Sequence, residues 1–221
     1  MNKIRVISLH NKPIDEVTYI LTKDEWKECL IIDPFNYENI DLWLQSNKKT
    51  CSYVFLTHEH YDHIAAVNQL REKFLAKSVA SENCAKRVAN ARKNLSVYFD
   101  ALLDMHGIPV TTRTEPYTVD KIDITFCHQY DMIFHGVVIH FVETPGHSPG
   151  SVCIEVEGCI FTGDSLLKDT PVITKFPEGN RIDYLNVTLP YLKEICENTV
   201  VYPGHGESFL MRDSKFINVT E

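Results

Sequence analysis

In the first half of the chain, segments with the apolar pattern of strands are followed by segments with the apolar pattern of helices. Three short apolar segments come first, separated by polar or proline-containing turns: KIRVISLH (3–10), VTYILT (17–22) and ECLIID (28–33). Segments of this length and composition, bounded by turn residues, predict strands of one sheet. YENIDLWLQSN (37–47) follows with grouped apolar residues and predicts a helix.

The same alternation continues to the end of the chain. Further strands are predicted at SYVFLT (52–57) and SVAS (78–81), and helices over 64–74 and 84–94. The second half predicts strands at 121–128, 137–144, 151–158, 159–164 and 199–204. One helix is predicted over 183–198, with Pro190 as an irregularity within it.

Strands with interspersed helices in both halves indicate two sheets covered by helices on their outer faces. The predicted fold class is therefore α+β, with four layers in the order αββα. The chain has 221 residues, which is the size of one domain with its own core, so we expect a single domain over 1–221. The least regular segment, 94–117, is predicted to be a flap over a site.

Composition narrows the class of protein. With 44% apolar and 24% charged residues, and no apolar run near the roughly 18 residues that a membrane span needs, we expect a protein that does not cross a membrane. The first residues form no signal-peptide core, so a cytoplasmic location is expected. Seven cysteines without a C-x-x-C pair are expected to be reduced core residues. A net charge of −8 disfavours nucleic acid as a partner, and the sequence leaves the oligomeric state open.

The stretch LTHEHYDHIAAV (56–67) places three histidines directly after an apolar strand. In an extended segment alternate side chains project to the same side, so His58, His60 and Asp62 are predicted to converge on one point. His63, at the start of the next helix, adds a fourth group. Imidazole and carboxylate groups that converge in this way are good ligands for a divalent metal, and this density favours a metal site over a solvated loop.

Three more potential ligands stand on loops at strand ends. They are His147 in TPGHSPGS, Asp164 in FTGD and His205 in YPGHG. Taken alone, a glycine-flanked histidine is more often structural, and an aspartate at a strand end more often caps a helix. Together with the first four residues they make seven ligands, whereas a closed structural zinc takes four. Two metals with three ligands each and one shared carboxylate would use all seven, as in open hydrolytic centres.

These four motifs in this order resemble the signature of the metallo-β-lactamase fold hydrolases, with the greatest likeness to the glyoxalase II (hydroxyacylglutathione hydrolase) branch. The resemblance implies that His58, His60 and His147 bind one metal and that Asp62, His63 and His205 bind the other. It also implies that Asp164 bridges the two metals. Asp33, in LIIDP, would orient the ligands, or else would be a structural aspartate at a strand end.

The resemblance predicts a dinuclear metal-dependent hydrolase, in which a metal-bridged hydroxide attacks a thioester, ester or lactone of a small metabolite. Asp62 and Asp164 would be the catalytic carboxylates. The nitrogen and oxygen ligands do not discriminate sharply among metals; two zinc ions are expected, with iron or manganese as alternatives. Two other functions on this scaffold stay open, a mononuclear iron persulfide dioxygenase and a phosphodiesterase or nuclease. After Asp164 the usual G-R-x-D stretch of the glyoxalase II branch is replaced by SLLKDTPVITKFPEGNR, so recognition of glutathione does not follow.

Weaker signals concern the substrate. Lys168 and Lys175 follow Asp164 in this divergent segment and are candidate substrate contacts, with exposed surface charges as the alternative. Tyr98 could line the mouth of the site or be buried under the flap. The basic residues of the helix over 84–94 are expected on a solvated face, and Glu59 and Tyr61 are expected to point away from the metal ligands.

Overall fold

The computed structural model describes residues 3–217 and contains two six-stranded sheets. The first sheet has its strands in sequence order. Strands β1 to β3 are antiparallel, and β3 to β6 run parallel. Its members are β1 (Arg5–Asn11), β2 (Glu16–Thr22), β3 (Glu28–Ile32), β4 (Thr50–Phe55), β5 (Lys77–Ser81) and β6 (Ile124–Phe126). Every residue of β2 is buried, as expected for an inner strand covered on both faces.

The second sheet has the order β12-β11-β10-β9-β8-β7 and is antiparallel except for the β10–β11 pair. Its strands are β7 (Gln129–Phe134), β8 (Val137–Glu143), β9 (Val152–Val156), β10 (Cys159–Gly163), β11 (Val200–Pro203) and β12 (Phe209–Leu210). Strands β7 and β12 were not predicted. Both lie at the edges of the sheet, where much of a strand is exposed and its apolar pattern is weak.

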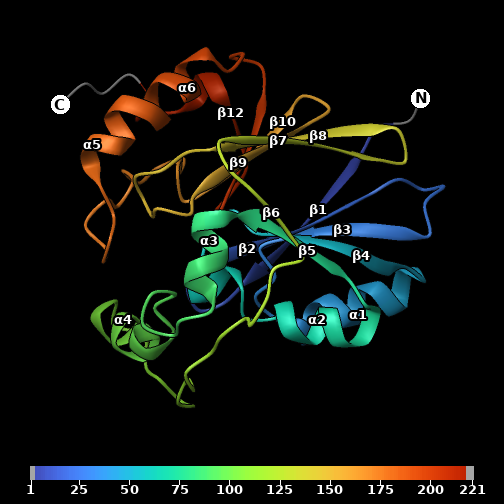
Figure 1. Cartoon of the computed structure of the whole chain (residues 1–221), viewed down its shortest axis with the longest axis horizontal. Coiled ribbons are helices and arrows are strands. Elements are labelled where there is room, and N and C mark those ends of the chain that lie inside the picture. Colours follow the sequence, from blue (N-terminus) through green and yellow to red (C-terminus); the bar gives the residue numbers. More distant parts are fainter. Residues whose placement is uncertain (1–2, 218–221) are drawn as a thin grey trace.

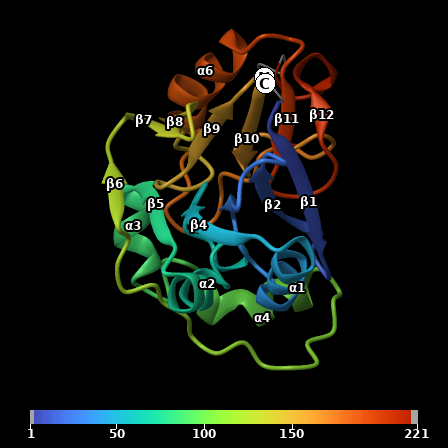
Figure 2. The same cartoon turned by 90° about the vertical axis from the view of Figure 1, so that its right-hand side faces the viewer.

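Helices cover the outer face of each sheet (Figures 1 and 2). On the first sheet these are α1 (Tyr37–Asn47), α2 (Val67–Phe74) and α3 (Glu82–Val88), and on the second sheet α6 (Leu189–Glu194). Helix α4 (Phe99–Met105) lies in the segment predicted as a flap, and the short helix α5 (Arg181–Asp183) precedes α6. Helix α1 begins after Asn36, whose side chain accepts a hydrogen bond from the Asn39 amide. A π-helical turn, Tyr184–Thr188, joins α5 to α6 just before Pro190, which has no amide hydrogen to donate. The predicted irregularity lies at this turn.

Three separate hydrophobic cores hold the layers together. One lies between the sheets and includes Leu30, Phe55, Phe141 and Phe161. The second packs α1, α2 and α3 on the outer face of the first sheet, and the third packs α6 on the outer face of the second sheet. These contacts confirm the predicted four-layer αββα arrangement (Figure 1).

The structure corrects three details of the predicted elements. Helix α2 begins at Val67, so His63 does not start it; His63 ends a 3₁₀ turn, Tyr61–His63. The helix predicted over 84–94 ends at Val88. The segment predicted as an irregular flap contains the helix α4. The ring centroid of Phe99 in this helix lies 5.0 Å from that of Tyr61.

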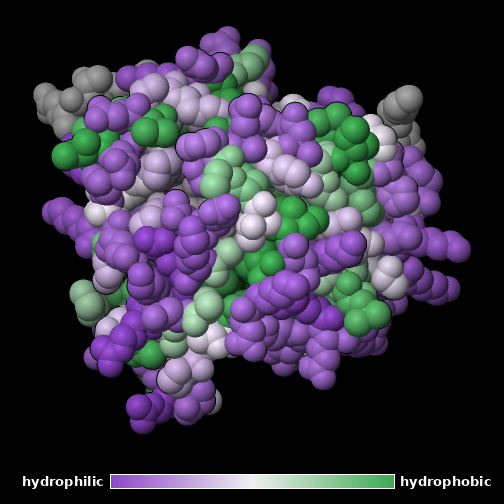
Figure 3. Space-filling view, in the orientation of Figure 1, coloured by the Kyte–Doolittle hydropathy of each residue, from purple (hydrophilic) through white to green (hydrophobic). Residues whose placement is uncertain are grey.

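The face of the molecule in Figure 3 is largely hydrophilic, with hydrophobic residues in separate patches. None of the helices within residues 3–217 is long and apolar enough to cross a membrane.

Candidate metal centre

The predicted ligands lie at the ends of strands that meet at one end of the two sheets. The segment 57–63 follows β4, Asp164 follows β10, and His205 follows β11. Backbone hydrogen bonds join these segments. The Val152 amide donates to the Thr57 carbonyl at 2.7 Å and links the two sheets, and the Gly204 amide donates to the Gly163 carbonyl at 2.8 Å and links neighbouring strand ends of the second sheet. The strand ends therefore form one rigid support for the ligand loops.

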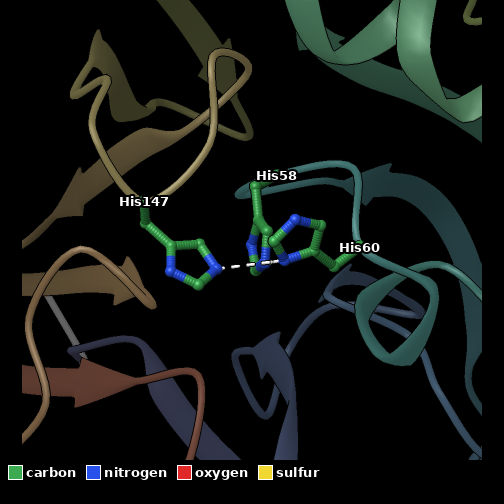
Figure 4. Close-up of side chains that lie close together, drawn as sticks. All are labelled: His58, His60 and His147. Atoms are coloured by element: carbon green, nitrogen blue, oxygen red, sulfur yellow. Dashed lines mark hydrogen bonds between the residues drawn. The ribbon is translucent and has the colours of Figure 1, made fainter. Parts of the chain in front are cut away.

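A first group of three buried histidines is formed by His58, His60 and His147 (Figure 4). The Nδ1 atom of His60 lies 3.1 Å from Nε2 of His58 and 3.0 Å from Nε2 of His147. A neutral imidazole has one N–H, so the three nitrogens cannot all pair with one another. Nitrogens bound to one tetrahedral zinc are about 3.3 Å apart, so the observed spacing fits a shared cation.

A second group contains Asp62, His63 and His205, whose ligand atoms lie within 4.8 Å of one another. The Nε2 atom of His205 is 3.5 Å from Oδ2 of Asp62, and Nε2 of His63 is 3.8 Å from the same oxygen. These separations are longer than strong hydrogen bonds. The three side chains thus form a cluster of potential metal-ligating atoms that are not joined by strong hydrogen bonds.

Asp164 lies between the two groups. Its Oδ2 atom is 3.6 Å from Nε2 of His147 in the first group and 3.5 Å from Nε2 of His205 in the second. Its Oδ1 atom is 3.7 Å from Nε2 of His63. One carboxylate therefore faces ligands of both groups.

Two atoms at this centre are buried without a hydrogen-bond partner among the described residues: Nε2 of His63 and Oδ1 of Asp164. Buried polar atoms without partners are rare, and a missing ion is one of the recognised reasons for them. The two atoms lie 3.7 Å from each other. The chain's own residues thus fit a divalent metal site.

The pKa shifts differ between the groups. Burial holds the pKa of His58 well below its usual range and lowers the pKa of His60 to about 3, so both imidazoles are neutral and ready to bind a metal. In the second group burial alone would lower the pKa of His205, but Asp164 and Asp62 outweigh it and raise this pKa to about 10. A metal bound there has to displace that proton.

Contacts behind the ligands fix their ring orientation. Asp33 accepts hydrogen bonds from the Thr57 amide at 2.8 Å and the Thr57 hydroxyl at 2.6 Å, and Nδ1 of His63 lies 3.0 Å from its Oδ2. Carbonyl oxygens do the same for two other rings: Ile173 O is 2.8 Å from Nδ1 of His147, and Ile14 O is 3.0 Å from Nδ1 of His205. In each case Nδ1 is the donor, which leaves Nε2 free to bind a metal.

The structure brings together all seven sequence-predicted ligands, with one difference in how they are placed. The extended conformation ends at His60, and Asp62 stands on the 3₁₀ turn, so the alternation argument holds for His58 and His60 only. The turn directs Asp62 towards His205 instead.

The predicted substrate residues are not joined to this centre by any contact within residues 3–217. Tyr98 is 42% exposed, Lys168 is half-buried and Lys175 is exposed. A residue that the sequence analysis missed, Phe176, lies closer: its ring centroid is 5.6 Å from that of His60 and 5.8 Å from that of His147. No motif marks this position, because it belongs to the divergent segment after β10.

Two mixed sheets between helices, with a histidine and aspartate centre at the strand ends, define a class of metal-dependent hydrolases. The chain belongs to the metallo-beta-lactamase superfamily, whose family model matches residues 13–205. The resemblance drawn from the motifs is thereby confirmed.

Relatives agree with this family. The chain is 29% identical over 200 residues to the probable metallo-hydrolase YqgX of Bacillus subtilis (strain 168), covering 88% of this chain and 86% of that protein. It is 25% identical over 207 residues to a hydroxyacylglutathione hydrolase of Pelagibacter ubique (strain HTCC1062), covering 91% and 70% of the two chains. The crystal structure of the BLEG-1 B3 metallo-beta-lactamase matches with a TM-score of 0.79 and 27% identity, covering 95% of each chain.

Proposed function

We propose that this chain is a dinuclear metal hydrolase that cleaves a thioester, ester or lactone of a small metabolite. The observation that carries the proposal is the placement of Asp164, whose carboxylate lies 3.6 Å from a histidine of the first group and 3.5 Å from a histidine of the second. A single-metal site would leave Asp62, His63 and His205 clustered without a role. Zinc is the proposed metal, because imidazole and carboxylate ligands suit it well.

When bound, two such ions supply a hydroxide nucleophile at neutral pH and polarise the carbonyl group of the substrate. The residues of the chain prepare the site for this chemistry. Burial keeps the first-group imidazoles neutral, while His63 and His205 overcome the effect of burial and hold the pKa of Asp62 below its usual range. Asp62 is therefore ionised at neutral pH, and we assign it the role of accepting a hydrogen bond from the attacking nucleophile and so orienting it.

The substrate class is supported by the relatives and by the surroundings of the site. One relative is named a hydroxyacylglutathione hydrolase, an enzyme that cleaves a thioester, and the Phe176 ring beside His60 offers an apolar contact for an acyl group. We retain the segment 94–117 as a proposed flap, because Phe99 packs against Tyr61 next to Asp62. Lys168, Lys175 and Tyr98 are retained as proposed contacts for the outer part of the substrate.

A direct test combines metal counting with a substrate screen. The metal content is measured by mass spectrometry in the protein as purified and again after loading with Zn²⁺, and thioesters, lactones, phosphodiesters and a persulfide are assayed with both forms. We expect two zinc ions per chain, hydrolysis of a thioester or lactone, and loss of that activity after chelation. A single iron with oxygen consumption on a persulfide, or turnover of RNA with inert thioesters, would overturn the proposal.

A second test concerns the orienting role proposed for Asp33. Asp33→Asn keeps the size of the side chain but removes its charge and turns one of its acceptor atoms into a donor. We expect the affinity for one zinc ion to fall about 10- to 100-fold, as for other residues that hydrogen-bond to metal ligands. Competition with a chromophoric chelator measures this, with the exposed Asp24→Asn as a control; equal zinc affinities in both variants would contradict the assigned role.

A further inference from the structure

A buried charged network lies behind the first metal group and is not part of the ligand set. Its central residue is Glu59, between His58 and His60 in the sequence, which is only 1% exposed. Its Oε2 atom accepts a hydrogen bond from the hydroxyl of Ser148 at 3.0 Å. Because Ser148 directly follows His147, this contact ties together the two loops that supply the first metal group.

The loop of Ser148 is shaped to receive this carboxylate. A Cβ atom added at Gly150 would lie 2.2 Å from Oε2 of Glu59 and 2.6 Å from the backbone of Cys84. No real side chain fits at that distance, so Glu59 can occupy this place only beside a glycine. The Gly150 position and the Ser148 hydrogen bond are two separate indications that the Glu59 carboxylate is held in one position here.

Arg87 of α3 connects the buried Glu59 to more exposed residues. Its Nε atom lies 3.5 Å from Oε1 of Glu59 and 3.2 Å from Oε2 of Glu178, and its side chain is only 14% exposed. The Nζ atom of Lys93 lies 3.5 Å from Oε1 of Glu178. Each of the two carboxylates thus has a cationic partner, and for the buried Glu59 this partner is Arg87. The basic residues of the helix predicted over 84–94 were expected on a solvated face, but the side chain of one of them, Arg87, contacts the buried Glu59.

Glu178 belongs to the segment that touches the first metal group from the other side. In this segment the Ile173 carbonyl lies 2.8 Å from Nδ1 of His147, and Phe176 packs against His60 and His147. The amide of Asn180 then donates to the carbonyl of Gly146 at 2.8 Å. These contacts therefore link the segments that carry or orient the three histidines.

We propose that Glu59, Arg87 and Glu178 are positioning residues that set the metal affinity of the group His58, His60 and His147. They act by holding the three segments that carry or orient these histidines in one arrangement. Within residues 3–217 Glu59, Arg87 and Glu178 make no hydrogen bond or ion pair with Asp62, His63 or His205, so the second metal position should depend on the network less than the first. This inference rests on the proposed two-metal function.

The experiment compares zinc binding to Arg87→Met with binding to Lys86→Met, using the full chain. Lys86 is the neighbouring residue of the same helix, is 67% exposed and pairs with Glu82, so its replacement makes the same charge change outside the network. We expect Arg87→Met to weaken one zinc equivalent about 10- to 100-fold and to affect the other much less. Lys86→Met should bind both equivalents as the unaltered protein does.

A second variant keeps the test decisive if Arg87→Met does not fold. The double variant Glu59→Gln/Arg87→Met leaves no unpaired buried charge, and it should still show selective weakening of one zinc equivalent. Glu178→Gln should give the same selective loss to a smaller degree. The urea midpoint of the metal-free protein is measured for each variant.

The inference is overturned if the folded variants bind both zinc equivalents normally. It is also overturned if both equivalents weaken together in proportion to a lower urea midpoint, since that result indicates a role in stability alone. Failure of the proposed function would be recognised differently: the unaltered protein itself would not bind two zinc ions.

Discussion

Replacing Asp164 by alanine is expected to remove at least one of the two metal ions and nearly all hydrolysis. The carboxylate lies 3.5 Å from His205 in one group and 3.6 Å from His147 in the other, so its loss affects both groups. It also removes negative charge that balances the cations. We expect activity to fall on the order of 10³-fold, the upper range for loss of one electrostatic group at an active site.

Metal content by mass spectrometry and the rate on the substrate found in the screen measure the effect. Asp169→Ala is the matched control, because this aspartate is 59% exposed, lies five positions further on and pairs with Lys215 on the surface. It should retain two zinc ions and full activity. An Asp164→Ala protein with unchanged metal content and rate would mean that this aspartate does not bridge the metals.

The fold could be predicted largely from apolar periodicity. Buried strands such as β2 and the helices α1 and α2 have strong patterns, because the burial of their apolar faces also stabilises them. Strands β7 and β12 were missed, since edge strands expose much of their surface and carry a weaker pattern. Helix α4 was missed for a similar reason, because only Phe99 and Leu103 of it are buried.

The cluster of histidines and aspartates could be predicted because its residue types are rare at this density and its motifs are local. Arg87 shows the limit of such reasoning. Its sequence neighbours are basic and exposed, and only the packing of α3 against the loop of Gly150 turns its side chain towards Glu59. Contacts between segments distant in sequence leave no local pattern, so Phe176 and the Glu59 network became visible only in the folded structure.

The residue before His205 provides a second test with a large expected effect. A Cβ atom at Gly204 would lie 2.2 Å from Oδ1 of Asp164 and 2.8 Å from Cε1 of His63. The backbone cannot move away easily, because the Gly204 amide donates to the Gly163 carbonyl at 2.8 Å and its own carbonyl accepts from the Val17 amide at 2.9 Å. Gly204→Ala must therefore displace Asp164 or His63, both proposed metal ligands, and a displacement near 1 Å costs about 10²-fold in rate.

The glycine on the other side of His205 is the matched control. Gly206 has a φ of +80°, but a Cβ atom added there would meet nothing within 4 Å. Gly206→Ala should lower the free energy of unfolding by about 1 kcal/mol through backbone strain and keep both zinc ions. Gly204→Ala should instead lose zinc affinity and activity, and this contrast separates displacement of a ligand from strain in the turn. Two zinc ions and unaltered hydrolysis in Gly204→Ala would show that Asp164 and His63 do not need their present positions.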